Sequence, residues 1–129
     1  TLEDYSDYVE IARNAGAGET LDRIIPEIYN EAMFPGTAML YSFPSYVYSL
    51  WQEYSVEELE YIASFCKEKG IPAATVYWEY WSEETEKIFE KNGISLYVYT
   101  VNDRDQARRY ISQGAEGICT DFLTAEDLW

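Results

Sequence analysis

The predicted fold is decided by two runs of sequence, Ile94-Ser-Leu-Tyr-Val-Tyr-Thr-Val-Asn-Asp103 and Gly114-Ala-Glu-Gly-Ile-Cys-Thr-Asp-Phe122. The first is β-branched and aromatic without a clean polar face, as is typical of a parallel strand covered on both sides. Asn102 and Asp103 end this strand and offer side-chain oxygens that cap a helix, and residues 104–111 follow with helical periodicity. Together the runs predict a strand, a helix and a second strand, with polar residues at each strand end.

The same unit recurs upstream. We predict five strands, at 24–29, 46–51, 73–78, 96–101 and 117–121. Their starts lie roughly 21 to 27 residues apart, which is room for a strand and a helix. Strands that alternate with helices predict a parallel sheet with right-handed crossovers, either open or part of a closed barrel. An open nucleotide-binding sheet is disfavoured because the sequence has neither Gly-x-Gly-x-x-Gly nor a Walker loop.

Helices are predicted in the gaps between the strands. Ser55-Val-Glu-Glu58 is a capping box, Ser82 opens the next helix, and a shorter helix begins at Pro35. The expected inward stripe of the Ser55 helix is Val56, Leu59, Ile62, Ala63 and Cys66. The first helix, 2–15, is expected to turn inward Leu2, Tyr5, Tyr8, Val9 and Ala12.

Composition excludes several classes of partner. The chain has 24 acidic and 9 basic residues, a net charge of −15 and no histidine. Without a basic patch, nucleic acid is not an expected partner. No stretch is long and apolar enough to span a bilayer. Cys66 and Cys119 are interpreted as small buried hydrophobic residues, so they do not identify a cellular compartment.

Four segments carry a family resemblance. They are Arg23-Ile-Ile-Pro-Glu-Ile-Tyr-Asn30, Ser45-Tyr-Val-Tyr-Ser-Leu-Trp51, Tyr99-Thr-Val-Asn102 and Gly117-Ile-Cys-Thr-Asp121. Together they resemble the C-terminal part of a glycerophosphodiester phosphodiesterase and, more loosely, the phosphatidylinositol-phospholipase-C-like phosphodiesterases. The pair formed by Thr-Val-Asn, a helix and Gly-x-x-Gly-Ile-x-Thr-Asp is the more specific part of this likeness.

The resemblance implies an α/β fold, a partial TIM (β/α) barrel holding about the last five of eight strand–helix units. We expect residues 1–129 to form a single incomplete domain, because a whole barrel needs about 250 residues. Five strands would leave two open sheet edges. A homo-oligomer is one way to cover them.

The implied chemistry is metal-assisted hydrolysis of a phosphodiester, with a histidine as general acid-base and a divalent metal, Mg or Ca, on the phosphoryl group. In the family these groups sit on the first three strands. Since this chain has no histidine and starts beyond that region, we assign it no catalytic and no metal-binding residue. We expect it to be a fragment that is inactive by itself, with the phosphodiester substrate belonging to the full-length protein.

Candidate substrate-binding residues follow from the rule that strand carboxyl ends form the active-site mouth of a barrel. The candidates are Glu27, Tyr29, Trp51, Trp78, Tyr99, Asn102 and Asp121. Some have structural interpretations: Asn102 is better explained as a helix cap than as a ligand contact, and Asp121 as a group that orients a neighbour. Glu27 follows a proline and could point inward as a pocket carboxylate.

Two other functions stay open. Residues 76–81 are rich in aromatic side chains, which could stack on a sugar or headgroup or simply pack at the barrel rim. A noncatalytic module that binds such a group through Trp51, Trp78 and Trp81 is therefore an alternative to the phosphodiesterase fragment. The other alternative is a different parallel α/β enzyme.

Overall fold

A computed structural model describes residues 1–129, which form two compact units, Thr1–Ser49 and Leu50–Trp129. Each unit alternates helices with strands, and the strand pairs within each are parallel. The predicted α/β class with parallel strands is confirmed. The expectation of one incomplete domain stays a prediction, and the units are described separately.

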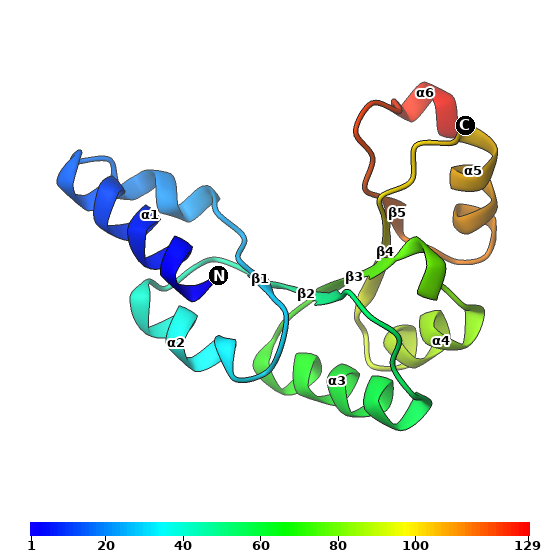
Figure 1. The fold of residues 1–129 in the computed structure, drawn as a ribbon, viewed down its shortest axis with the longest axis horizontal. Helices are drawn as coiled ribbons and strands as arrows, with labels where there is room; N and C mark the ends of the chain where they lie inside the picture. Colours follow the sequence, from blue (N-terminus) through cyan, green and yellow to red (C-terminus); the bar gives the residue numbers. More distant parts are fainter. The chain divides into compact units, whose positions relative to one another are not determined.

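The first unit consists of α1 (Leu2–Asn14), the 3-10 helix η1 (Gly18–Arg23), β1 (Glu27–Ile28), α2 (Met33–Leu40) and β2 (Val47–Leu50), whose last residue opens the second unit. Helix α1 packs against α2 and η1 (Figure 1). Strands β1 and β2 pair with Glu27 opposite Val47. The predicted strand 24–29 is much longer than β1, since Pro26 has no N–H to donate to a ladder.

The core of the first unit is built from Val9, Ala12, Leu21 and Phe43. The ring of Phe43 meets Tyr41 and Tyr46 edge-on, with centroids 5.2 and 6.2 Å away. The prediction that Leu2 and Tyr8 of α1 face inward is wrong, because Leu2 is 39% exposed and Tyr8 is 54% exposed. The buried stripe of α1 is narrower than the sequence pattern, because only Val9 and Ala12 are fully covered.

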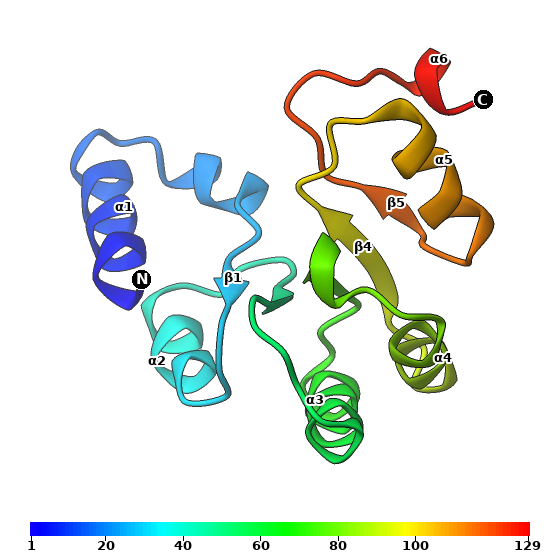
Figure 2. The same ribbon diagram turned by 45° about the vertical axis from the view of Figure 1, so that its right-hand side comes forward.

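The second unit contains α3 (Val56–Lys69), β3 (Ala73–Tyr77), the 3-10 helix η2 (Trp78–Tyr80), α4 (Glu83–Lys91), β4 (Ser95–Tyr99), α5 (Arg104–Ser112), β5 (Gly117–Ile118) and α6 (Ala125–Leu128). Strand β4 lies between β3 and β5. Figure 2 shows α3 and α4 next to each other and α5 beside β5. The two 3-10 helices and α6 were not predicted.

Helix starts in the second unit follow the predicted caps. Ser55 and Glu58 form the predicted capping box, and Gly70 ends α3 with φ +69°. Val56 is 45% exposed, against expectation, because it is the first helical residue and lies outside the covered stripe. Both cysteines are free thiols; Cys66 is buried as predicted, whereas Cys119 is exposed at the end of β5.

The two faces of β4 differ. Leu96 and Val98 are buried, while Tyr97 and Tyr99 on the opposite face are half-buried. The prediction of an interior strand is confirmed, because β4 pairs with both β3 and β5, but the face of Tyr97 and Tyr99 is only partly covered. None of the helices is both long and apolar enough to cross a membrane.

Candidate functional site

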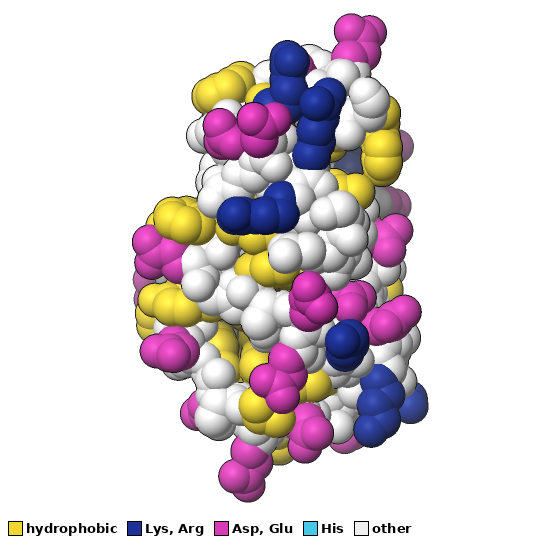
Figure 3. All heavy atoms as spheres, turned by 90° about the vertical axis from the view of Figure 1, so that its right-hand side faces the viewer, with side chains coloured by type: hydrophobic (Ala, Val, Ile, Leu, Met, Phe, Trp, Pro, Cys, Tyr) yellow, Lys and Arg dark blue, Asp and Glu magenta, His cyan; other side chains and the backbone are white.

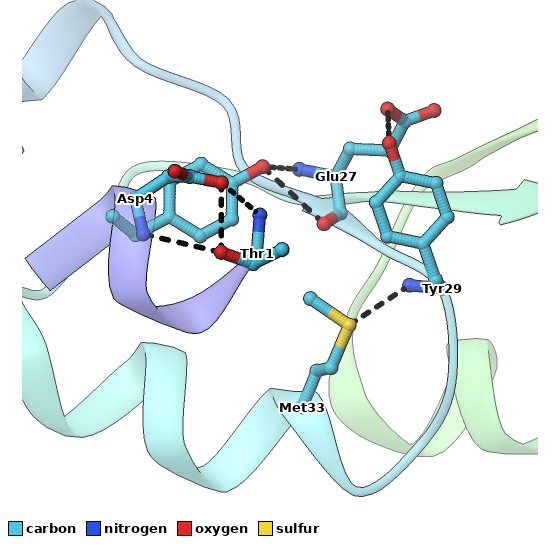
Figure 4. Close-up of polar contacts among 6 residues, drawn as sticks. Thr1, Asp4, Glu27, Tyr29 and Met33 are labelled. Atoms are coloured by element: carbon cyan, nitrogen blue, oxygen red, sulfur yellow. Dashed lines mark hydrogen bonds and ion pairs between the residues drawn. The ribbon is translucent and has the colours of Figure 1, made fainter.

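Each unit carries polar side chains at the carboxyl ends of its strands. In the first unit these are Glu27 on β1 and Tyr29 just after it, both sequence-predicted candidates. The Tyr29 hydroxyl donates to Oε2 of Glu27 over 2.7 Å. The Tyr29 N–H donates to Sδ of Met33 at the start of α2, 3.5 Å away (Figure 4). The pair thus presents a carboxylate and a phenol at one strand end.

Tyr5 of α1 holds the backbone of Glu27. Its hydroxyl accepts from the Glu27 N–H over 2.7 Å and donates to the Glu27 carbonyl oxygen over 3.3 Å (Figure 4). Burial raises the pKa of the Tyr5 hydroxyl, so the neutral form that makes both bonds is favoured. The sequence pattern assigned Tyr5 only to the core, because nothing local links it to a strand 22 residues away.

In the second unit the candidates Asn102 and Asp121 are brought together. Nδ2 of Asn102 donates to Oδ2 of Asp121 over 2.7 Å. Oδ1 of Asn102 accepts from the Thr120 hydroxyl (2.9 Å) and from the Asp121 N–H (3.0 Å). The side chain of Asn102 therefore joins the segment after β4 to the segment after β5.

The interpretation of Asn102 as a helix cap is wrong. The N-cap of α5 is Asp103, whose side chain accepts from the Gln106 N–H over 2.8 Å. Asn102 precedes the cap, and its amide reaches the neighbouring strand end instead. The structural role expected for Asp121, orienting a neighbour, agrees with its bond to Asn102.

Aromatic rings gather at the ends of β3 and β4. The ring of Tyr77 lies 5.7 Å from both Trp78 and Tyr99, and 5.8 Å from Tyr80. The candidates Trp78 and Tyr99 therefore share Tyr77 as a neighbour, a residue that was not among the predicted site residues. Trp51 is 52% exposed on the segment that follows β2.

The residues present do not fit a divalent metal. Such a site needs several oxygen ligands converging on one point. No group of three or more His, Cys, Asp or Glu side chains is arranged to hold an ion. We therefore derive no catalytic step through a metal bound by this chain.

Comparison with known proteins identifies the class. The profile of the glycerophosphoryl diester phosphodiesterase family matches residues 37–125. Because this match covers more than half of the chain, the chain belongs to that family. The predicted resemblance is confirmed. No curated protein sequence matches the chain.

Solved structures confirm the fold. A protein from Silicibacter pomeroyi described as a glycerophosphoryl diester phosphodiesterase has a TM-score of 0.67 at 16% identity, over 92% of this chain and 41% of that one. A glycerophosphodiester phosphodiesterase from Parabacteroides distasonis has a TM-score of 0.61 at 19% identity, over 94% and 49% of the two chains. An Oleispira antarctica phosphodiesterase in complex with the product sn-glycerol-3-phosphate has a TM-score of 0.58 at 12% identity, over 79% and 37%.

The chain thus spans less than half the length of each of these three structures. Its parallel α/β fold corresponds to part of a (β/α) barrel, as the sequence predicted.

Proposed function

We propose that residues 1–129 supply substrate-facing strand ends of a glycerophosphodiester phosphodiesterase barrel, and that the catalytic histidine and the metal ligands lie outside these residues. The family membership supports the reaction class, and the absence of histidine from the sequence supports the second part. The observation that carries the proposal is the gathering of polar side chains at carboxyl ends of parallel strands, where barrels of this kind hold their sites.

The residues have distinct roles in this proposal. The Asn102 amide, which keeps a second N–H besides the one donated to Asp121, is a donor for phosphoryl or hydroxyl oxygens of the substrate. The Tyr29 hydroxyl donates its proton to Glu27, so it positions that carboxylate and can itself accept from a substrate hydroxyl. Glu27 and Asp121 are acceptors for the hydroxyls of a glycerol group, since a carboxylate repels a phosphodiester. Trp51, Trp78 and Tyr99 offer flat apolar faces to the carbon skeleton. With a net charge of −15, the chain relies on a cation bound elsewhere in the barrel, Mg or Ca, to bind an anionic substrate.

Two assays test the proposal. The 129 residues alone, with a glycerophosphodiester and Mg or Ca, are expected to give no turnover, and metal-dependent hydrolysis by them would contradict this. A longer protein that adds the preceding strands is expected to hydrolyse the same substrate. In it, Glu27→Gln and Asn102→Ala should raise KM, whereas the exposed control Glu19→Gln should not.

A noncatalytic headgroup- or sugar-binding module is the second candidate. Trp78 and Trp81 line an open groove of about 390 Å³ together with Arg109 and Tyr110, which favours a flat polar ligand. The upstream coding sequence separates the two candidates. A His-Arg-Gly after a strand, with Glu-x-Asp on the next, favours the enzyme, and an upstream segment without them favours the module.

Self-association is a further part of the proposal. A second copy would cover strand edges that five strands leave open. Sedimentation of the purified chain tests this, and a monomer across the accessible concentration range would contradict it.

A further inference from the structure

A cavity of about 260 Å³ lies in the second unit, between the segment 50–59 and the segment 76–85. Three carboxylates line it, from Glu53, Glu79 and Glu84, and three aromatic rings, from Tyr54, Tyr80 and Trp81. Two of these residues, Glu79 and Tyr80, belong to the 3-10 helix η2. Tyr80 and Trp81 belong to the aromatic run 76–81, for which the sequence suggested either stacking on a sugar or headgroup or packing at the barrel rim.

The charge of this cavity is unbalanced. No Lys or Arg lines it. Two other grooves of the unit are mixed: Arg109 accompanies Glu83 in one, and Lys87 and Lys91 accompany Glu60 and the outer side of Glu84 in the other. Positive and negative side chains also lie near one another on the face drawn in Figure 3, where Lys and Arg are dark blue and Asp and Glu are magenta. The cavity therefore combines negative charge with aromatic surface in a way that these grooves do not.

The helix N-termini that border the cavity have side-chain caps, so they do not favour an anion there. Ser55 and Glu58 already bond each other's N–H groups at the start of α3. The Ser82 hydroxyl accepts from the Thr85 N–H over 3.0 Å at the start of α4. An anionic ligand would find these donors satisfied and would meet three carboxylates.

The ring of Trp81 is held in place before any ligand arrives. Its Nε1 donates to the side-chain oxygen of Gln113 over 3.2 Å. Its ring meets Tyr110 edge-on, with centroids 5.8 Å apart. A ring held at these two points loses little freedom when a ligand binds beside it.

We propose that this cavity binds a small organic ammonium ion. The carboxylates of Glu53, Glu79 and Glu84 balance the charge, and the rings contact the carbon groups around the nitrogen, as cation–π sites do. The volume lies just below the range of about 300–1,000 Å³ that is typical of pockets for drug-sized ligands, which suits a small ion. The ammonium could be a free amine or the cationic end of a larger phosphodiester. The proposal concerns binding and does not rest on the proposed hydrolysis.

The test is an NMR titration of the whole chain with choline, using its uncharged carbon isostere 3,3-dimethylbutan-1-ol as the matched probe. Choline is expected to shift the Trp81 indole N–H and the amides of Glu79 and Tyr80 saturably, and the isostere is expected to bind at least about fivefold more weakly. Glu53→Gln and Glu79→Gln should each weaken choline binding by about five- to tenfold. Glu116→Gln, the same charge change at an exposed site outside the cavity, should change it less than about twofold.

Three outcomes would overturn the proposal: equal binding of choline and the isostere, equal weakening by the Glu116 control, or no saturable shift at the cavity. Titration with glycerophosphocholine distinguishes a free amine from the cationic end of a phosphodiester as the ligand. Tighter binding than choline, still weakened by Glu79→Gln, assigns the site to the ammonium of a phosphodiester, and weaker binding assigns it to a free amine. Because no turnover is measured, failure here leaves the hydrolysis proposal to its own assay.

Discussion

The two units fix their strand ends by different means. In the first unit, β1 has two residues, and both backbone groups of Glu27 bond to the hydroxyl of a single helix residue, Tyr5. In the second unit, β3 and β4 pair over five positions, from Ala73 opposite Ser95 to Tyr77 opposite Tyr99. This long backbone ladder supports β3 and β4, and polar side chains bond to one another after β4 and β5.

This difference shows which contacts stabilise the strand ends of each unit. The strand end of the first unit is held by a two-residue pairing with β2 and by the contact of Tyr5 with Glu27 across 22 residues. The second unit depends on close backbone packing between neighbouring strands and on the link across 19 residues from Asn102 to Asp121. Residue-level hydrogen exchange distinguishes a change in the first unit from one in the second, because it reports the local opening of each region separately.

The largest effect is expected from Gly117→Ala in the second unit. A Cβ at position 117 would lie 2.8 Å from two ring carbons of Tyr97, so the ring or the strand must move. We expect a loss of about 2 kcal/mol in the stability of β4 and β5, measured by urea unfolding and amide exchange. Gly18→Ala is the control in the first unit, because an added Cβ there meets nothing within 4 Å. Equal losses for both variants would show that packing against Tyr97 is not the cause.

Tyr5→Phe should loosen the first unit only. The Glu27 N–H loses its acceptor while it is partly buried, which is expected to destabilise β1 by about 1–2 kcal/mol. Faster exchange of the Glu27 amide, with unchanged exchange in β3 and β4, is the expected measurement. Tyr8→Phe is the matched control, because Tyr8 is exposed on the same helix. Equally faster exchange in β3 and β4 would contradict the inference that Tyr5 supports the first unit alone.

Asn102→Ala removes three hydrogen bonds from an exposed site, so we expect a smaller loss of about 1 kcal/mol, confined to the segment after β5. Asn102→Asp should destabilise more, because it places a carboxylate against that of Asp121. Repulsion raises the pKa of the pair, so stability should return as pH falls and the pair takes up a proton. A pH-independent deficit in Asn102→Asp, measured by urea unfolding, would argue against this contact.

The smallest effect is expected at the start of α3. Ser55→Ala removes the N-cap and should cost about 0.5–1 kcal/mol, whereas Ser64→Ala in the exposed middle of the helix should cost nothing. The Ser55 N–H lowers the pKa of the Glu58 carboxyl. That stabilisation is present above the ordinary carboxyl pKa and is lost as pH falls through the lowered folded value. The protection of the amides in the first turn of α3, taken relative to the intrinsic exchange rate at each pH, should therefore fall on acidification. Glu58→Gln should show less of this change.

Local signals predicted much of the fold. The capping box at Ser55 and Glu58 and the cap at Ser82 gave helix starts that the structure confirms. Helix α6 carries a comparable signal in Thr124 and Asp127, although no helix was predicted there. These signals work because a cap and its partner are only three residues apart.

The candidate site was less predictable. The polar residues at strand ends could be named, but not how they bond: Asn102 was assigned to a cap that Asp103 provides. Tyr77, the common neighbour of Trp78 and Tyr99, was missed because a ring contact between strands leaves no mark in either strand's own sequence. Cys119 was expected to be buried, and its exposure depends on where β5 ends.

The sequence by itself determined the order of the five strands and the helices between them, the helix caps at Ser55 and Ser82, and the family, because each rests on residue types at short, fixed spacings. The tertiary structure decided that Tyr5 holds Glu27, that Asn102 joins Asp121, and that the cavity near Trp81 is lined by carboxylates without cations. These features depend on residues far apart in the chain. Only the packing of helices and strands, which fixes distance and direction together, brings such residues within hydrogen-bonding reach.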